Sequence, residues 1–297
     1  MFPKFPNFNK LTIEAFSLIS SQLFLARRRI SELALANLFV WEDFDRPQYT
    51  FINNNLCLLI SPPNEKPYFL EPFTQHELFN TVDTCLQHSG RISRASGDLV
   101  CQLPRRNFHL SPLRSEFDYL YLTKDLAELK GKKFDGKRNH IKRFTRRFPN
   151  YSFIPLENKY KKEAMELFDR WFDVRKESRY FPKLAYVAQK NALLKAFSNF
   201  EKLKLMGGTI LAEKTIKGFI IGSKLNDETV SAHFMYVDPE FDGVTQTLLW
   251  KACQGFFSTF TYINLEQDLG IPGLRTAKLS YHPLKLEKKF EINPLSF

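Results

Sequence analysis

The feature that most constrains the fold is the order of secondary structure that residue patterns predict for the second half of the chain. Alternating apolar and polar residues indicate strands, and apolar residues three or four positions apart indicate helices. The predicted order is a strand, two helices, three strands, a helix and a strand, at residues 151–156, 158–177, 185–200, 203–212, 216–224, 229–237, 245–257 and 260–265. The connections between the three central strands are short, which favours an antiparallel meander.

The first half of the chain follows a similar order less closely. Its predicted elements are two helices, a hairpin, a third strand, a helix and a further strand, at residues 11–25, 30–41, 48–53, 56–61, 66–71, 75–88 and 115–123. Such a series, present approximately twice, is the layout of the GNAT acyltransferase fold. We therefore expect an α/β (α+β) protein of two tandem GNAT-like domains with mixed, largely antiparallel sheets. The expected boundaries are residues 1–123 for the first domain, 124–150 for a basic helical connector and 151–297 for the second domain.

Composition agrees with two globular domains. A chain of 297 residues, of which 43% are hydrophobic, can bury two cores, and this excludes a disordered chain. The four cysteines and six histidines have no metal-ligand spacing, so neither a metal site nor a disulfide framework is expected. The sequence contains no apolar run long enough for a membrane span, and its N-terminus lacks the pattern of a secretory signal. We expect a cytoplasmic protein.

Positive charge is concentrated in one segment. The net charge is +11, and residues 131–147 carry eight cations against a single acid, Asp135. At helical spacing one side is apolar, with Phe134, Ile141, Phe144 and Phe148, and the cations occupy the rest: Lys132, Lys133, Lys137, Arg138, Lys142, Arg143, Arg146 and Arg147. Such a helix predicts binding to a polyanion. We prefer tRNA, with an anionic surface at the inner face of the membrane as the alternative. A solvated helix face without a partner is the third interpretation.

A second group of polar residues follows the last predicted strand. Glu266, Gln267 and Asp268 end that strand, and a turn rich in glycine and proline follows at residues 270–273. Two cations and a phenol then recur at helical spacing: Arg275, Lys278 and Tyr281. Carboxylates that face cations across a tight turn indicate a site for a polar ligand. The alternative is an ordinary strand-loop-helix corner whose charges are solvated or paired.

Four stretches of the chain resemble the phosphatidylglycerol lysyltransferase C-terminal-domain family. They are LALANLFVW, DYLYLTKD, KKFDGKRNHI and EQDLGIPGLRTAKLSY, at residues 33–41, 118–125, 132–141 and 266–281. The resemblance covers nearly the whole chain in the expected order. It implies two fused GNAT-like domains and kinship with enzymes that take an aminoacyl group from a charged tRNA. In the membrane-bound members the acceptor is the headgroup of phosphatidylglycerol. The multi-helix membrane portion of those members is not in this sequence, so we leave the acceptor as a hydroxyl or an amine.

Aminoacyl transfer from tRNA suggests roles for the polar residues. Because the ester is already activated, the protein must mainly position the acceptor, take its proton and stabilise the oxyanion. We assign catalytic roles as base, ammonium ligand or proton donor to Glu266, Asp268 and Tyr281. We assign substrate-binding roles to Arg275, Lys278, Gln267 and His233. His233, in the strand at residues 229–237, is also a candidate general base, although a lone strand histidine is more often structural.

Two other functions stay open. A coenzyme A thioester would need a glycine-rich turn before the helix at residues 245–257, because backbone N–H groups there bind the pyrophosphate. The segment has one glycine, Gly243, and two acids, Glu240 and Asp242, which disfavour a phosphate. We instead expect a helix start capped by Asp242 or Thr245. The remaining alternative is a non-catalytic module that binds an anionic ligand. No cofactor beyond the acyl donor is expected.

Overall fold

A computed structural model describes residues 2–17, 19–20, 29–73 and 76–295. The chain forms two compact units. Unit 1 contains Met1–Asp118, Gln267–Gly270 and Leu286–Phe297, and unit 2 contains Tyr119–Glu266 and Ile271–Lys285. Residues 124–150 are thus part of unit 2, and the C-terminal residues return to unit 1. The expected boundaries assumed that the units are successive segments of the chain, whereas each unit is assembled from separate segments.

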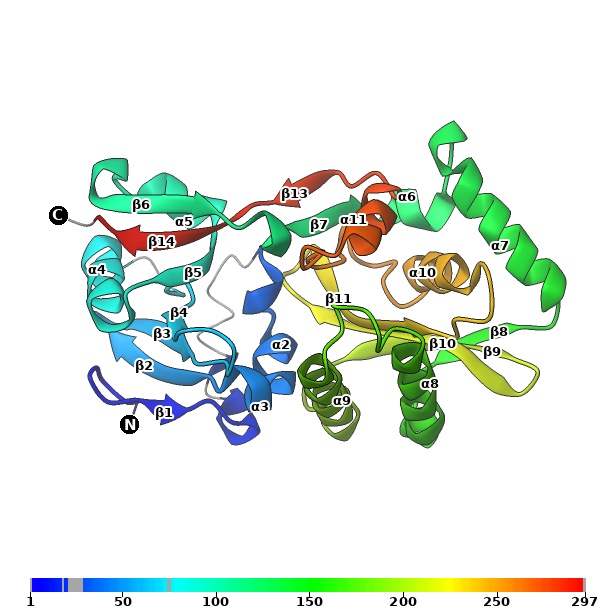
Figure 1. The fold of residues 1–297 in the computed structure, drawn as a ribbon, viewed down its shortest axis with the longest axis horizontal. Coiled ribbons are helices and arrows are strands. Elements are labelled where there is room, and N and C mark those ends of the chain that lie inside the picture. Colours follow the sequence, from blue (N-terminus) through cyan, green and yellow to red (C-terminus); the bar gives the residue numbers. More distant parts are fainter. Residues whose placement is uncertain (1, 18, 21–28, 74–75, 296–297) are drawn as a thin grey trace. The chain divides into compact units, whose positions relative to one another are not determined.

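Unit 2 is built on a mixed sheet with the strand order β13-β7-β12-β11-β10-β9-β8 (Figure 1). The strands are Asp118–Leu122 (β7), Ser152–Pro155 (β8), Met206–Ala212 (β9), Thr215–Lys224 (β10), Thr229–Val237 (β11), Tyr262–Asn264 (β12) and Lys285–Glu287 (β13). The predicted meander is present, since β9, β10 and β11 pair antiparallel in sequence order. β12 then pairs parallel with β11, and β7 pairs antiparallel with β12.

Helices cover both faces of this sheet (Figure 1). They are Thr123–Glu128 (α6), Asp135–Arg147 (α7), Lys161–Asp173 (α8), Lys183–Ser198 (α9), Val244–Gln254 (α10) and Pro272–Leu279 (α11). On one face Phe219 of β10 packs against Phe197 of α9, with ring centroids 6.2 Å apart. On the other face the neighbouring Gly218 lies against Leu248 of α10. Successive β10 residues therefore serve the two faces in turn, as the strand period requires.

Unit 1 is built on a second mixed sheet, with the order β1-β2-β3-β4-β5-β14-β6. The strands are Asn9–Lys10 (β1), Gln48–Ile52 (β2), Asn55–Ile60 (β3), Tyr68–Phe69 (β4), Ile92–Ser96 (β5), Phe108–Pro112 (β6) and Lys289–Pro294 (β14). The α-helices are Leu35–Val40 (α2), Glu42–Asp45 (α3), Leu78–Ser89 (α4) and Gly97–Gln102 (α5). The predicted hairpin is confirmed. Asn53 and Asn54 form its turn with φ of 49° and 62°, a conformation that asparagine tolerates better than most residues.

The two sheets repeat one arrangement. In each, an antiparallel meander is followed by a helix and then by a strand that pairs parallel with the last meander strand: β5 with β4, and β12 with β11. In each, a strand distant in sequence then pairs antiparallel with that strand: β14 with β5, and β7 with β12. The expected tandem α/β fold is confirmed. The sequence did not predict β5, β6 and β14, because β14 pairs with strands far from it in the sequence.

Helix predictions were correct in position and less so in length. The helix expected at residues 30–41 is divided into a 3-10 helix, Ser31–Leu33, and α2, because Ala34 is extended. Of the helix expected at residues 11–25, Ile13–Ala15 form a 3-10 helix and residues 16–17 and 19–20 are α-helical, while residues 18 and 21–28 lie outside the described part of the chain. In unit 2, α8 ends at Asp173, before residue 177. In the described ranges no helix combines the length and the apolar character that crossing a membrane requires.

Two irregularities in the unit 2 sheet create a site at its centre. The pairing of β10 with β11 shifts at Ile221 and Gly222, so that His233 is the extra residue of a β-bulge. The parallel pairing of β11 with β12 ends at Ser231 and Asn264, whereas β11 continues to Val237. Beyond Ser231, therefore, β12 no longer covers the edge of β11.

Candidate functional site

Glu266 lies two residues beyond β12, where β12 separates from β11. Its φ of 60° is unusual for a residue other than glycine. The backbone is held there because the Glu266 N–H donates to Asn264 Oδ1 (2.7 Å) and the Glu266 carbonyl accepts from the Tyr119 N–H (3.3 Å). Non-glycine residues in this conformation are concentrated at functional sites. The Glu266 side chain is 18% exposed.

The carboxylate of Glu266 begins a chain of hydrogen bonds across three strands. Its Oε1 accepts from the Ser231 hydroxyl (3.1 Å) and lies 2.8 Å from His233 Nδ1, both on β11. His233 Nε2 lies 2.7 Å from the hydroxyl of Ser223 on β10. The imidazole is 1% exposed, and both serines are buried. We call Ser223, Ser231, His233 and Glu266 the β-face cluster.

Sequence reasoning selected Glu266 and His233 as separate candidates and missed the two serines. Alternation along β11 placed Ser231 on the same side as His233, which was a usable signal for that residue. Ser223 could have been found only from the register of β10 against β11, in which it pairs with Ser231. The bulge at His233 has no local sequence signal.

Lys278 lies beside the same backbone segment. Its ammonium group donates to the carbonyl of Leu265 (2.7 Å), and its own carbonyl accepts from the Tyr121 hydroxyl (2.8 Å). Arg275 lies one turn earlier on α11, so the two cations occupy the same side of that helix. The glycine-proline turn thus returns the expected cations toward the strand that carries Glu266.

Gln267 and Asp268 belong to unit 1. Gln267 donates to Ser31 Oγ (3.1 Å) and Glu32 Oε1 (2.7 Å). Asp268 is fully buried, and its carboxylate accepts from Arg114 (2.8 Å) and from the Gly270 N–H (2.9 Å). The three consecutive polar residues therefore enter separate networks.

Tyr281 is buried against α7. Its ring lies 3.9 Å from the Nζ of Lys137, a cation–π contact, and burial raises the pKa of its hydroxyl. The hydroxyl has no hydrogen-bond partner among the residues that the structure describes. Burial lowers the pKa of Lys137, which also contacts Ser280 Oγ (2.5 Å).

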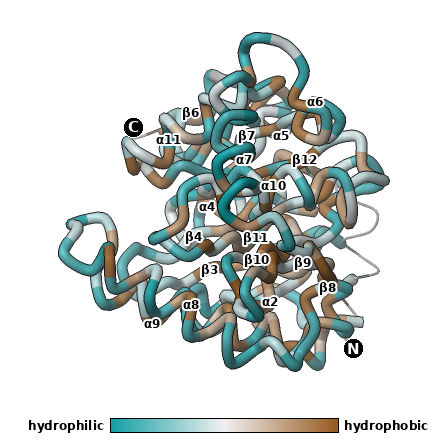
Figure 2. Tube along the Cα trace, turned by 90° about the vertical axis from the view of Figure 1, so that its right-hand side faces the viewer, coloured by the Kyte–Doolittle hydropathy of each residue, from teal (hydrophilic) through white to brown (hydrophobic). Residues whose placement is uncertain are grey.

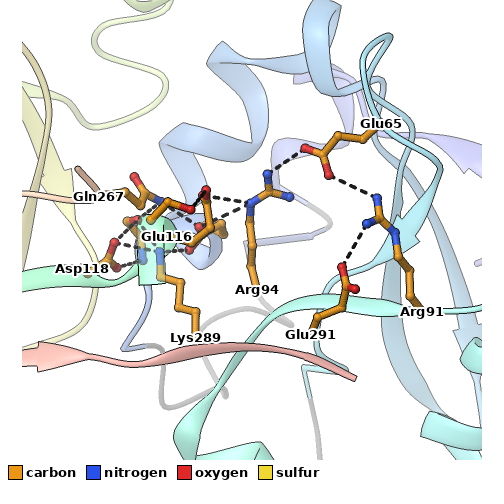
Figure 3. A network of polar contacts seen from close by, with 11 residues as sticks. Glu65, Arg91, Arg94, Glu116, Asp118, Gln267, Lys289 and Glu291 are labelled. Atoms are coloured by element: carbon orange, nitrogen blue, oxygen red, sulfur yellow. Dashed lines mark hydrogen bonds and ion pairs between the residues drawn. The ribbon is translucent and has the colours of Figure 1, made fainter. Parts of the chain in front are cut away.

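Unit 1 contains a buried ionic network that sequence reasoning missed (Figure 3). Lys289 of β14 is fully buried, and its Nζ contacts Asp118 Oδ1 (2.7 Å) and Glu32 Oε2 (2.5 Å). Burial raises the pKa of Glu32 to about 7, against the opposing effect of Lys289. Asp118 also accepts from the N–H and the hydroxyl of Ser31. The network joins β14 to the segment before α2.

The network extends to a second bulge. Arg94 lies in β5 with φ of 57°, where the pairing of β5 with β14 shifts. Its guanidinium pairs with Glu65 (2.9 Å) and Glu116 (3.4 Å) and lies 4.8 Å from the centre of the Tyr68 ring. Arg91 pairs with Glu65 (3.1 Å) and Glu291 (2.9 Å). Arg91 and Arg94 therefore form ion pairs within unit 1.

Helix α7 has the predicted amphipathic character. Phe134, Ile141, Phe144 and Phe148 are all buried, and the helix is hydrophilic along its length in Figure 2. Its cations do not form one uniform surface. Arg138 donates to the carbonyl of Gly131 (3.0 Å) and also contacts the Leu129 carbonyl and Asp135, so it supports the turn before the helix.

Acids from outside α7 neutralise part of its charge, which counting within the segment could not show. Asp242 contacts His140 (2.6 Å) and Arg143 (2.5 Å), and the hydrogen bond from Arg143 is the main cause of its lowered pKa. Lys133 lies 3.8 Å from Asp125, and Arg147 lies over the rings of Phe148 and Phe241. Three exposed cations have no ion pair or hydrogen bond to another described residue: Lys132, Lys142 and Arg146.

The start of α10 is closed by α7. Gly243 has φ of 84°, and a Cβ added there would lie 2.1 Å from the carbonyl oxygen of His140. Neither Asp242 nor Thr245 caps the helix, so that expectation was wrong. Asp242 instead pairs with α7, and Thr247 donates its hydroxyl to the Gly243 carbonyl (2.8 Å). In the described part of the chain, no three His, Cys, Asp or Glu side chains are grouped as metal ligands.

The fold belongs to the tandem GNAT-like class. The structure resembles that of a tandem GNAT protein from the clavulanic acid biosynthesis pathway, with a TM-score of 0.50 and 10% identity over 97% of this chain and 98% of that one. It also resembles the C-terminal domain (DUF2156) of a putative lysylphosphatidylglycerol synthetase from Agrobacterium fabrum, with a TM-score of 0.66 and 14% identity over 96% and 93%. These likenesses establish the fold.

The family follows from the sequence match. Residues 24–293 match the family described as phosphatidylglycerol lysyltransferase, C-terminal, and the chain belongs to it. A conserved protein of unknown function from Bacteroides thetaiotaomicron VPI-5482 is 28% identical, with a TM-score of 0.88 over 99% of this chain and 100% of that one. An uncharacterized protein of Mycoplasmoides gallisepticum is 26% identical over 178 residues, 59% of this chain. The match covers 56% of that relative, about half of its length.

Proposed function

We propose that this protein transfers an aminoacyl group from an aminoacyl-tRNA to a hydroxyl or amine acceptor. The observation that carries the proposal is the position of Glu266 where β11 and β12 diverge, in an acyltransferase fold of the phosphatidylglycerol lysyltransferase C-terminal family. The carboxylate is partly exposed at that point and is held by hydrogen bonds from Ser231 and His233. A fixed carboxylate beside a strand opening is suited to take a proton from an acceptor.

The chemistry requires one proton transfer in each direction. The acceptor oxygen or nitrogen attacks the ester carbonyl and gives its proton to Glu266, and the ribose hydroxyl leaves after it receives a proton from the same carboxyl group. Two cations on the same side of α11 provide positive charge near the developing oxyanion. They are Lys278, whose ammonium group donates to the Leu265 carbonyl, and Arg275. Asp268 and Gln267 are given no part in this scheme, because Asp268 pairs with Arg114 and Gln267 donates to Glu32, both in unit 1.

Helix α7 is proposed to bind the phosphates of the tRNA. The contacts of α7 divide its cations into two sets. Arg138 supports the preceding turn, whereas Lys142 and Arg146 are exposed and available to phosphates. Lys142 and Arg146 lie four residues apart, so they occupy neighbouring turns of one side of the helix.

The charge-reversed variant Lys142→Glu/Arg146→Glu tests the RNA surface. Each lost phosphate contact should lower the slope of log K against log salt by roughly 0.7–0.9, so the slope should fall by about 1.5. The variant Lys162→Glu/Lys202→Glu makes the same change in net charge at exposed positions elsewhere in unit 2 and should leave the slope nearly unchanged. Equal slopes for the two double variants would mean that α7 presents only a solvated face.

A coenzyme A thioester as donor has less support. A pyrophosphate would need the N-terminal N–H groups of α10, and the His140 carbonyl lies against Gly243 at that end. Asp242, the residue before Gly243, adds negative charge at the same end of the helix. Thermal stabilisation by coenzyme A would favour this donor over aminoacyl-tRNA.

The transfer itself is tested with a pool of radiolabelled aminoacyl-tRNAs and cell extract. The proposal predicts that label moves from the tRNA fraction into a lipid, peptide or small-molecule fraction only when the protein is present. Label that remains on tRNA, or is released solely as free amino acid at the uncatalysed rate, would contradict it. The fraction that gains label identifies the acceptor class.

A further inference from the structure

We propose that Ser223 is a positioning residue that allows the buried pair of His233 and Glu266 to hold a proton. The proposal rests on the proposed function and deepens it by adding the part of the β-face cluster that the substrate does not touch. Its basis is the continuous path Ser223 Oγ, His233 Nε2, His233 Nδ1, Glu266 Oε1, with steps of 2.7 Å and 2.8 Å on either side of the ring.

The polarity of the path follows from the groups in it. An ionised carboxylate can only accept a hydrogen bond, so His233 Nδ1 carries hydrogen and donates to Glu266. In the neutral imidazole Nε2 is then an acceptor, and the Ser223 hydroxyl donates to it. A hydroxyl can rotate, so the same oxygen accepts from Nε2–H when the ring is protonated. Ser223 is therefore able to satisfy both protonation states of the ring.

Exposure decides which end of the path meets the substrate. Glu266 is 18% exposed, whereas Ser223 is 4% exposed and the imidazole 1%. Both nitrogens of His233 are engaged, so the ring offers no atom to an acceptor molecule. Glu266 is accordingly the group that receives the acceptor's proton, and Ser223 and His233 act through it.

The effect of Ser223 follows from the cost of an unsatisfied donor. A buried imidazolium whose Nε2–H lacks an acceptor is disfavoured, so the proton affinity of the pair should fall by about tenfold or more. Without the Ser223 hydroxyl, the pair of His233 and Glu266 is a weaker base. A weaker base takes the proton from the attacking hydroxyl or amine less readily. A change at Ser223 leaves the other titratable side chains on the elements around Glu266 in place. They are Asp118, Tyr119 and Tyr121 on β7, Lys217 and Lys224 on β10, Tyr236 on β11, Tyr262 on β12, and Arg275 and Lys278 on α11.

The first test is the pH–rate profile of transfer for Ser223→Ala. We expect the acid limb to move down by about one pH unit and the rate on the plateau to fall about tenfold. Ser223→Thr keeps the hydroxyl and should restore both values. Ser258→Ala removes an exposed hydroxyl of unit 2 and should leave the profile unchanged. A purely structural role would lower the amount of folded protein without moving the acid limb, and an unmoved limb in Ser223→Ala would overturn the proposal.

The second test does not depend on activity. In protein labelled with ¹⁵N-histidine, the ring signals of His233, assigned with His233→Asn, should titrate at lower pH in Ser223→Ala than in the parent. If the parent shows no transfer but this titration moves, the proposed function fails while the role of Ser223 stands. If transfer occurs and neither readout changes in Ser223→Ala, the role of Ser223 fails alone. Covalent labelling of Ser223 by a fluorophosphonate would also overturn it, because Ser223 would then be the reacting group.

Discussion

The buried lysine of unit 1 gives a prediction whose size follows directly from the structure. Lys289 is fully buried, and its ammonium group contacts Asp118 (2.7 Å) and Glu32 (2.5 Å), with Ser31 Oγ at 3.4 Å. Lys289→Met keeps the approximate length of the side chain and removes its charge. Asp118 is also fully buried, so its carboxylate loses its cation without access to water. Removing one partner of a buried pair typically costs about 3–5 kcal/mol.

Urea unfolding followed by circular dichroism measures this cost. We expect the free energy of unfolding of unit 1 to fall by about 3–5 kcal/mol, which corresponds to about 10 °C in melting temperature. Lys288→Met, at the exposed preceding residue, is the matched control and should change stability by less than about 0.5 kcal/mol. If Lys289→Met is as stable as Lys288→Met, the ionic network does not stabilise unit 1 and the reasoning from burial is refuted.

Two further predictions concern stability. The pKa of Glu32 is raised from 4.5 to about 7, so between these pH values the folded state binds more protons than the unfolded state. Stability should therefore fall as pH rises through that window. Glu32→Gln should flatten this pH dependence in unfolding curves recorded from pH 4 to pH 8, and an unchanged slope would contradict the prediction. Gly243→Ala places a Cβ 2.1 Å from the His140 carbonyl oxygen at φ of 84° and should cost about 2 kcal/mol or more. Gly136→Ala, on α7 with no atom within 4 Å of the added Cβ, should stabilise by roughly 0.5–1 kcal/mol, and equal effects of the two alanines would refute the packing argument.

The elements predicted best are those with strong local patterns. The meander β9–β11 and its turns were found because strand-length apolar segments and the short polar connections between them are visible in the sequence itself. The strands β6 and β14 were missed because they are stabilised by partners far along the chain; β14 pairs with β5 and β6. Long-range pairing of this kind leaves little local signal. It also explains why the units are not successive segments.

The candidate site was predicted in part for the same reason. Glu266, Lys278 and Arg275 were found because they surround a recognisable turn, and His233 because a histidine in an apolar strand is conspicuous. The contact between His233 and Glu266 depends on a bulge and on where two strands part, which only the register reveals. Asp268 has the same chemistry as Glu266, yet its carboxylate holds Arg114 and a turn. Sequence identifies the chemical groups here, and packing decides which of them remain accessible.

The central claim is tested most directly by single-turnover transfer from a labelled aminoacyl-tRNA to the acceptor identified in the extract, with Glu266→Gln compared against Glu228→Gln. Glu228 is an exposed residue of the β10–β11 connection in the same unit, so the control makes the same chemical change away from the site. We predict that Glu266→Gln loses two or more orders of magnitude in rate while tRNA affinity and melting temperature stay near those of the parent. Glu228→Gln should transfer at the parent rate. Transfer by Glu266→Gln at the parent rate would contradict the account.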